Sequence, residues 1–178
     1  MGGLHDTDFT RPSLLPGWSV SHVLTHVARN AEAMCRRLEG ALRSEIVEQY
    51  AGGPPGRDAE IERGAQRPPA EIREDVIDWS IRLDELFESS PDDVWGRPVR
   101  TVAGGEHPVA LLPFRRWREV EVHLVDLGLG VSPADWSGGL VDRALPRLID
   151  GLIHRADQRE LMAWLLGRRP APELRAWG

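Results

Sequence analysis

Two histidines and a glutamate are the residues of this chain whose types and spacing best suit joint chemistry. His26 lies in one amphipathic segment, and Glu119 and His123 form a Glu-x-x-x-His pair in another. Catalytic zinc is held by three nitrogen or oxygen ligands, with a fourth position left for water or substrate. If two helices bring these three side chains together, the sequence predicts a metal-dependent enzyme.

Helical geometry selects these three residues over their neighbours. At about 100° per residue, Glu119 lies about 40° from His123, whereas Glu121 points about 160° away from His123. On the first segment His26 flanks the apolar face, and His22 is rotated about 40° further toward solvent. We therefore expect His26, Glu119 and His123 to be the inward-facing candidates.

Two other interpretations of these residues stay open. A Glu/His pair at this spacing is often an exposed pair on a helix surface, and a lone histidine often forms hydrogen bonds at a helix boundary. Asp126 follows His123 by three residues. It is placed either to orient a ligand imidazole or simply to lie near a helix end.

Apolar residues at alternating steps of four and three predict three long helices that position these groups. The first follows the candidate N-cap Ser19 and runs to about residue 43, the second covers 72–86, and the third covers roughly 111–127 before Gly128. The Gly- and Pro-rich stretch from about 52 to 69 predicts a connecting loop, in which the string DAEIER could add a turn of helix. The segment RPVRTVAGGEHP predicts a small hairpin over its Gly-Gly pair.

The last 50 or so residues also show helical periodicity. One segment covers 145–152, where Pro146 requires either a place in the first turn or a kink. Asp157 and Glu160 resemble a capping box that opens a last helix, which Gly167 ends. We therefore expect an all-α protein, with a helical bundle over 1–130 and a short helical region over 131–178.

Composition excludes several classes of function. The net charge of −6 argues against a nucleic-acid partner, and all 22 basic residues are arginine, which excludes Schiff-base lysines and P-loop lysines. Cys35 is the single cysteine and is interpreted as a small apolar filler. No apolar run or signal-peptide pattern indicates a membrane span or export, so we expect a soluble cytoplasmic protein. The arginines at 115, 116 and 118 are interpreted as a solvated face, with the alternative that Arg115 and Arg116, which flank the Glu119 side, attract an anionic substrate.

Three strings resemble the mycothiol-dependent maleylpyruvate isomerase family: PSLLPGWSVSHVLTHVARNAEA, RDAEIERGAQRP and REVEVHLVDLGLGVSPADW. The resemblance implies a DinB-like four-helix bundle that binds a divalent metal, typically zinc. In that family the ligands are the histidine of the LTH motif and the glutamate and histidine of the E-x-x-x-H motif. These motifs fall on His26, Glu119 and His123.

The resemblance also implies the cofactor and the reaction. Mycothiol would supply the nucleophilic thiol for which the chain has no suitably placed cysteine, and its thiolate would add to the cis double bond of maleylpyruvate. Rotation and elimination would then give fumarylpyruvate and return the thiol. The family places an arginine for the anionic substrate in its C-terminal domain, and Arg168 in AWLLGRR is the closest match. The alternative is that Arg168 is a basic residue just beyond a helix C-terminus.

The chain departs from the family pattern at both ends. Family members carry a long helix before the PSLLPGW string, so we expect the first bundle helix to be missing because the start is assigned too late, or to be replaced by the C-terminal helices or a second subunit. The C-terminal region shows no strand pattern and looks reduced. Two alternative functions therefore remain, a metal-dependent mycothiol S-transferase and a non-catalytic metal- or thiol-binding module. A monomer or homodimer is expected.

Overall fold

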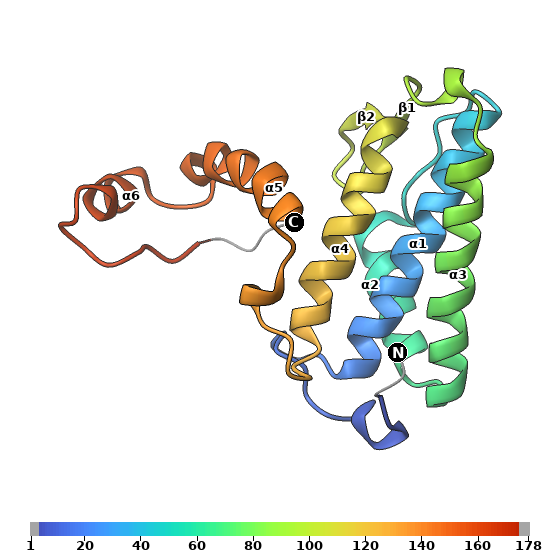
Figure 1. Ribbon diagram of the computed structural model, residues 1–178, viewed down its shortest axis with the longest axis horizontal. Coiled ribbons are helices and arrows are strands. Elements are labelled where there is room, and N and C mark those ends of the chain that lie inside the picture. The colour runs from blue at the N-terminus through green and yellow to red at the C-terminus, as the bar shows by residue number, and fades with distance from the viewer. Residues whose placement is uncertain (1–3, 175–178) are drawn as a thin grey trace. The chain divides into compact units, whose positions relative to one another are not determined.

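The computed structural model describes residues 4–174, and the chain divides into two compact units, Met1–Asp135 and Trp136–Gly178. The described part of the first unit, residues 4–135, contains four α-helices and a two-stranded sheet (Figure 1). The helices are α1 (Val20–Leu42), α2 (Gly53–Ala65), α3 (Pro69–Ser89) and α4 (Leu112–Asp126), and the strands are β1 (Pro98–Arg100) and β2 (Glu106–Pro108). The expectation of a mainly helical bundle is confirmed.

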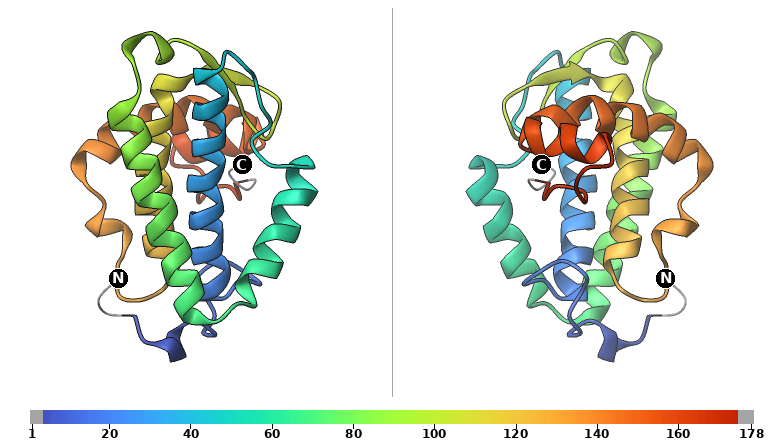
Figure 2. Two further views of the ribbon diagram at one scale, coloured as in Figure 1. Left: turned by 90° about the vertical axis from the view of Figure 1, so that its right-hand side faces the viewer. Right: turned by 90° about the vertical axis from the view of Figure 1, so that its left-hand side faces the viewer.

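Helix α1 is the central element of the first unit. It packs against α3, α2 and α4, and in Figure 2 it runs between α3 and α2. Helices α1 and α3 run in the same direction, whereas α4 runs in the opposite direction (Figure 1). The N-cap of α1 is Ser19, as expected, and Gly128 adopts a φ of +67° just after α4. The three long helices predicted from periodicity are confirmed.

Helix α2 corrects the expectation that residues 52–69 form a connecting loop. The segment is helical over 13 residues because its prolines occupy the first turn, where a missing N–H is tolerated. Ile61 is buried, and an added Cβ on Gly64 would lie 2.4 Å from Cγ2 of Thr25 on α1. Close packing against α1 therefore stabilises a helix whose composition is typical of a loop.

The interior contains two apolar clusters with polar residues between them. One cluster lies towards the end of α1 that includes Leu38, and the other lies towards the end that includes Val23. On α4, Leu112 belongs to the first cluster, and Leu127, which directly follows the helix, belongs to the second. Between these clusters α1 buries polar residues instead, among them His26 and Asn30. The interior is therefore polar at the level where the predicted ligands lie.

The small hairpin expected over the Gly-Gly pair is present. Strands β1 and β2 are antiparallel, with Val99 opposite His107. Gly104 has a φ of +84° in the connecting turn, a conformation that glycine adopts readily. Val99 is buried in one of the apolar clusters, so the hairpin packs on the bundle.

The second unit contains α5 (Gly138–Gly151) and α6 (Gln158–Leu165), and its residues up to 174 form no strand. The Asp157 carboxylate accepts hydrogen bonds from the N–H groups of Arg159 and Glu160, and Gly167 has a φ of +69° beyond α6. Of the two alternatives for Pro146, the structure excludes a place in the first turn. Helix α5 begins earlier than predicted, at Gly138, so Pro146 lies in its interior rather than in its first turn.

Residues 4–19 precede α1 and contain a short 3₁₀ turn, Asp6–Asp8, but no α-helix. Ile77 and Ile81 on α3, and Val120 and Leu124 on α4, expose between 41% and 53% of their surface. The bundle therefore has apolar side chains in contact with solvent on these two helices. Within residues 4–174, no helix combines the length and apolar character needed to cross a membrane.

Candidate metal centre

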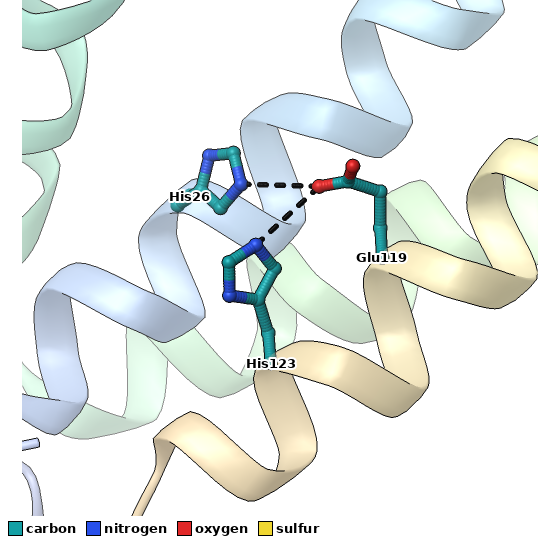
Figure 3. A group of neighbouring side chains, drawn as sticks. All are labelled: His26, Glu119 and His123. Atoms are coloured by element: carbon teal, nitrogen blue, oxygen red, sulfur yellow. Dashed lines mark hydrogen bonds and ion pairs between the residues drawn. The ribbon is translucent and has the colours of Figure 1, made fainter. Parts of the chain in front are cut away.

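The three predicted ligands meet in the interior of the first unit. His26 comes from α1, whereas Glu119 and His123 come from successive turns of α4 (Figure 3). Glu119 Oε2 lies 3.3 Å from Nε2 of His26 and 3.4 Å from Nε2 of His123. One donor atom from each residue lies within 4.8 Å of the other two. Two nitrogens and one carboxylate oxygen converge on one point, which is the donor set of a three-ligand divalent-metal site.

The three side chains are largely shielded from solvent. Their exposed fractions are 6% for His26, 15% for Glu119 and 13% for His123. Burial lowers the pKa of His26, although its contact with Glu119 acts in the opposite direction. Burial alone would raise the pKa of Glu119, but the hydrogen bonds with His123 and His26 outweigh it and hold that pKa well below its usual range. A neutral His26 and an ionised Glu119 are the forms that bind a metal ion.

Two neighbours orient the histidine rings. Asp126 Oδ2 lies 2.8 Å from Nδ1 of His123, so the carboxylate accepts a hydrogen bond from the Nδ1–H group and turns Nε2 toward Glu119. The ring of Trp18 lies 5.7 Å from that of His26, and the two histidine rings meet edge to face at 4.6 Å. Of the two interpretations of Asp126 from the sequence, this contact favours the one in which Asp126 orients the imidazole of His123.

His22 and Glu121, which helical rotation did not favour as ligands, have other partners in the structure. The ring of His22 caps the start of α1, because the Ser19 N–H donates to its Nδ1 at 3.2 Å. The carboxylate of Glu121 accepts a hydrogen bond from the indole N–H of Trp117. Neither His22 nor Glu121 belongs to the cluster of three ligand candidates. The preference for His26 and Glu119 from helical rotation agrees with this arrangement.

Arg116 corrects the interpretation of 115, 116 and 118 as a solvated face. Its side chain is buried and donates to the backbone oxygen of Val27 at 2.8 Å, to Oδ1 of Asn30 at 3.2 Å and to Oγ of Ser80 at 3.0 Å. These acceptors belong to α1 and α3, so Arg116 links three helices beside the candidate site. Burial lowers the pKa of Arg116, and the charge of Glu119 opposes this effect.

Cys35 is buried in an apolar cluster, in keeping with its interpretation as a filler. Burial raises the pKa of Cys35 to about 11, so its thiolate is scarce at neutral pH. Arg168 lies just beyond α6, in the unit that does not carry the three ligand candidates. Its side chain is exposed, and its backbone N–H donates to the oxygen of Ala163. The role of Arg168 in substrate binding stays a prediction.

Sequence reasoning did not assign a role to Arg57 or Trp18, both of which lie at the site. Arg57 Nη2 is 3.3 Å from Nδ1 of His26, and its guanidinium lies over the ring of Trp18 at 5.9 Å. Both residues occur within the strings that carry the family resemblance. An arginine one helical turn before a buried apolar residue is the signal that would have drawn attention to Arg57, but it requires α2 to be recognised as a helix.

The chain is a DinB-like helical bundle, with two histidines and one glutamate converging in its interior. A family model described as the mycothiol maleylpyruvate isomerase N-terminal domain matches residues 1–128. The chain belongs to this family. No curated protein shows a significant match to it.

Two solved structures resemble the chain. One is the crystal structure of the mycothiol-dependent maleylpyruvate isomerase, at 32% sequence identity and a TM-score of 0.75. The other is a histidine-to-alanine mutant of that isomerase, at 31% identity and the same TM-score. In both cases the match covers 78% of this chain and 57% of the solved chain. The match therefore extends over little more than half of the length of these relatives.

Proposed function

We propose that this protein is a metal- and mycothiol-dependent cis–trans isomerase of the maleylpyruvate isomerase type. The single observation that carries the proposal is the convergence of His26, Glu119 and His123 within 4.8 Å in a chain of this family. The solved relatives, which are described as mycothiol-dependent maleylpyruvate isomerase, support the same reaction class.

We further propose that the metal is zinc, held by Nε2 of both histidines and by the Glu119 carboxylate. Zinc suits a mixed nitrogen and oxygen set of three protein ligands, which leaves a position for an external group. When bound, the metal would lower the pKa of a thiol, so that the nucleophilic thiolate is available at neutral pH. The residues of the chain hold and orient its ligands: Asp126 fixes the His123 ring through Nδ1, and Trp18 shields His26.

The thiol in this proposal comes from outside the chain. Cys35 is the only cysteine, it lies in the apolar core, and its pKa is raised by burial. A buried thiol of high pKa is a poor nucleophile. The chain therefore depends on a small-molecule thiol, and family membership favours mycothiol.

The substrate of the proposed reaction is a small dianion with a conjugated cis double bond, of which maleylpyruvate is the example. Arg168 remains our candidate for a carboxylate of this substrate. The acidic net charge of −6 supports a function without nucleic acid. We propose action in the cytoplasm, as a monomer or homodimer.

The proposal is tested by following maleylpyruvate and free mycothiol together in a reaction with zinc-loaded protein. An isomerase converts maleylpyruvate to fumarylpyruvate only when mycothiol is present, and the thiol concentration stays constant. Consumption of thiol in proportion to product indicates an S-transferase instead. Metal binding without turnover of either kind would indicate a non-catalytic binding module.

Two variants make the assay specific to the site. His26→Ala removes one ligand and should abolish turnover. Glu121→Gln is the matched control on α4, because Glu121 accepts a hydrogen bond from Trp117 and lies outside the cluster of ligand candidates. Turnover that survives in His26→Ala would refute the proposed site.

A further inference from the structure

Arg57 is the charged residue of α2 that reaches the candidate metal centre. Its Nη2 lies 3.3 Å from Nδ1 of His26, while Nε2 of the same ring faces Glu119. We propose that Arg57 binds a carboxylate of the small molecule that enters this centre. This inference rests on the proposed function and adds to it a specificity-determining residue for anionic ligands.

The position of Arg57 is set by the packing of its helix. Arg57, Ile61 and Gly64 follow at steps of four and three, so they share one face of α2. Ile61 is 1% exposed, and Gly64 permits a backbone approach that an added Cβ would block at 2.4 Å from Thr25. The face that carries Arg57 is therefore held closely against α1, the helix of His26.

The present partners of Arg57 leave its guanidinium N–H groups able to bind a ligand carboxylate. Its partners are Nδ1 of His26 and Oδ1 of Asp58, and the Asp58 side chain is 66% exposed. An ion pair with so exposed a carboxylate is weak, because water screens it. Arg57 can therefore exchange this pair for a ligand carboxylate at little cost.

Ligand chemistry at His26 strengthens this expectation. A neutral imidazole carries one N–H, so a ring that offers Nε2 to a metal keeps its proton on Nδ1. Nδ1 then no longer accepts from Arg57, and two donors face each other. The guanidinium needs an acceptor beside a metal-bound His26, and a carboxylate accepts from arginine in a bidentate manner.

The buried arginines near the site differ from Arg57 in this respect. Arg116 donates to a backbone oxygen and to two side chains from α1 and α3. Arg37 donates to the backbone oxygens of Ala33 and Arg100. Both are held by acceptors that join elements of the fold, so binding a ligand would break structural contacts.

The test compares two small thiols that differ by a carboxylate, 3-mercaptopropionate and 2-mercaptoethanol. Their dissociation constants for zinc-loaded protein are measured by isothermal titration calorimetry. We expect the wild type to prefer 3-mercaptopropionate, and Arg57→Met to reduce that preference roughly tenfold or more. The same thiols are compared in every variant, so their intrinsic difference in metal affinity cancels.

Arg63→Met on the exposed part of α2 is the matched control and should retain the wild-type preference. Arg57→Lys keeps the charge without the bidentate geometry and should retain part of the preference for 3-mercaptopropionate. Zinc content and thermal unfolding show that each variant is folded and loaded. If Arg57→Met destabilises the protein, Arg57→Gln provides a second test.

An Arg57→Met protein with an unchanged preference would overturn the inference while leaving the proposed function intact. If neither thiol binds to the loaded wild type, the proposed function fails instead. Binding of maleate, a dicarboxylate without a thiol, then still tests Arg57. Maleate affinity that falls roughly tenfold in Arg57→Met supports the inference, and an unchanged affinity overturns it.

Discussion

Replacing Asp126 by asparagine should weaken metal binding without disrupting the bundle. The Asp126 carboxylate lies 2.8 Å from Nδ1 of His123 and accepts a hydrogen bond from its N–H, which turns Nε2 toward the site. Loss of such an orienting contact typically lowers metal affinity by about 10- to 100-fold, or about 1.4 to 2.8 kcal/mol. The expected change is in affinity, because an asparagine side chain has nearly the size of the aspartate that it replaces and leaves the backbone contacts intact.

The affinity is measured by competition for zinc with a chromophoric chelator, in wild type and in Asp126→Asn. Glu121→Gln on the same helix is the control, and its affinity should stay within about twofold of wild type, since surface changes rarely exceed about 0.5 kcal/mol. Thermal unfolding of the metal-free proteins reports any general loss of stability. An Asp126→Asn protein that binds zinc as tightly as wild type would refute the orienting role of this carboxylate.

Three further predictions concern the bundle that positions the site. Because burial raises the pKa of Cys35 from 9.0 to about 11, iodoacetamide at pH 8 should alkylate the native protein about 100-fold more slowly than the denatured chain. Equal alkylation rates would contradict the burial of Cys35. Between pH 9 and 11 the unfolded chain releases the thiol proton while the folded chain keeps it, so the free energy of unfolding should fall as pH rises through this range. The fall should be smaller in Cys35→Ala. Gly64→Ala should destabilise the protein by about 1–3 kcal/mol in urea unfolding, because its Cβ would lie 2.4 Å from the side chain of Thr25, whereas Gly96→Ala, where an added Cβ meets nothing within 4 Å, should not. Ile72→Ala should cost about 2–5 kcal/mol in the same measurement because Ile72 is fully buried, and a cost below about 1 kcal/mol would contradict its place in the core.

The long helices and the ligand candidates were predictable because local rules determine them. The apolar period of α1 places His26 on the flank of its buried face, and a spacing of four residues aligns Glu119 with His123. Apolar periodicity does not determine the distance between two helices. Convergence of His26 with the pair on α4 came from the family resemblance and is seen directly only in the structure.

The parts that sequence reasoning missed depend on tertiary contacts. The composition of α2 is typical of a loop, and its helix is stabilised by packing of Ile61 and Gly64 against α1. Arg116 was interpreted as solvated because arginine is rarely buried without partners, but its acceptors come from α1 and α3. Since such partners are distant in sequence, neither the burial of Arg116 nor the contact of Arg57 with His26 follows from local patterns.

The most direct test of the account is the zinc content of the purified chain, measured by mass spectrometry after dialysis against metal-free buffer. We expect about one zinc per chain in the wild type, and the same in His22→Ala, because His22 caps α1 and takes no part in the centre. The His26→Ala protein should retain almost none. A wild-type chain that binds no zinc, or a His26→Ala protein that keeps its full content, would contradict the proposal that His26, Glu119 and His123 form a metal centre.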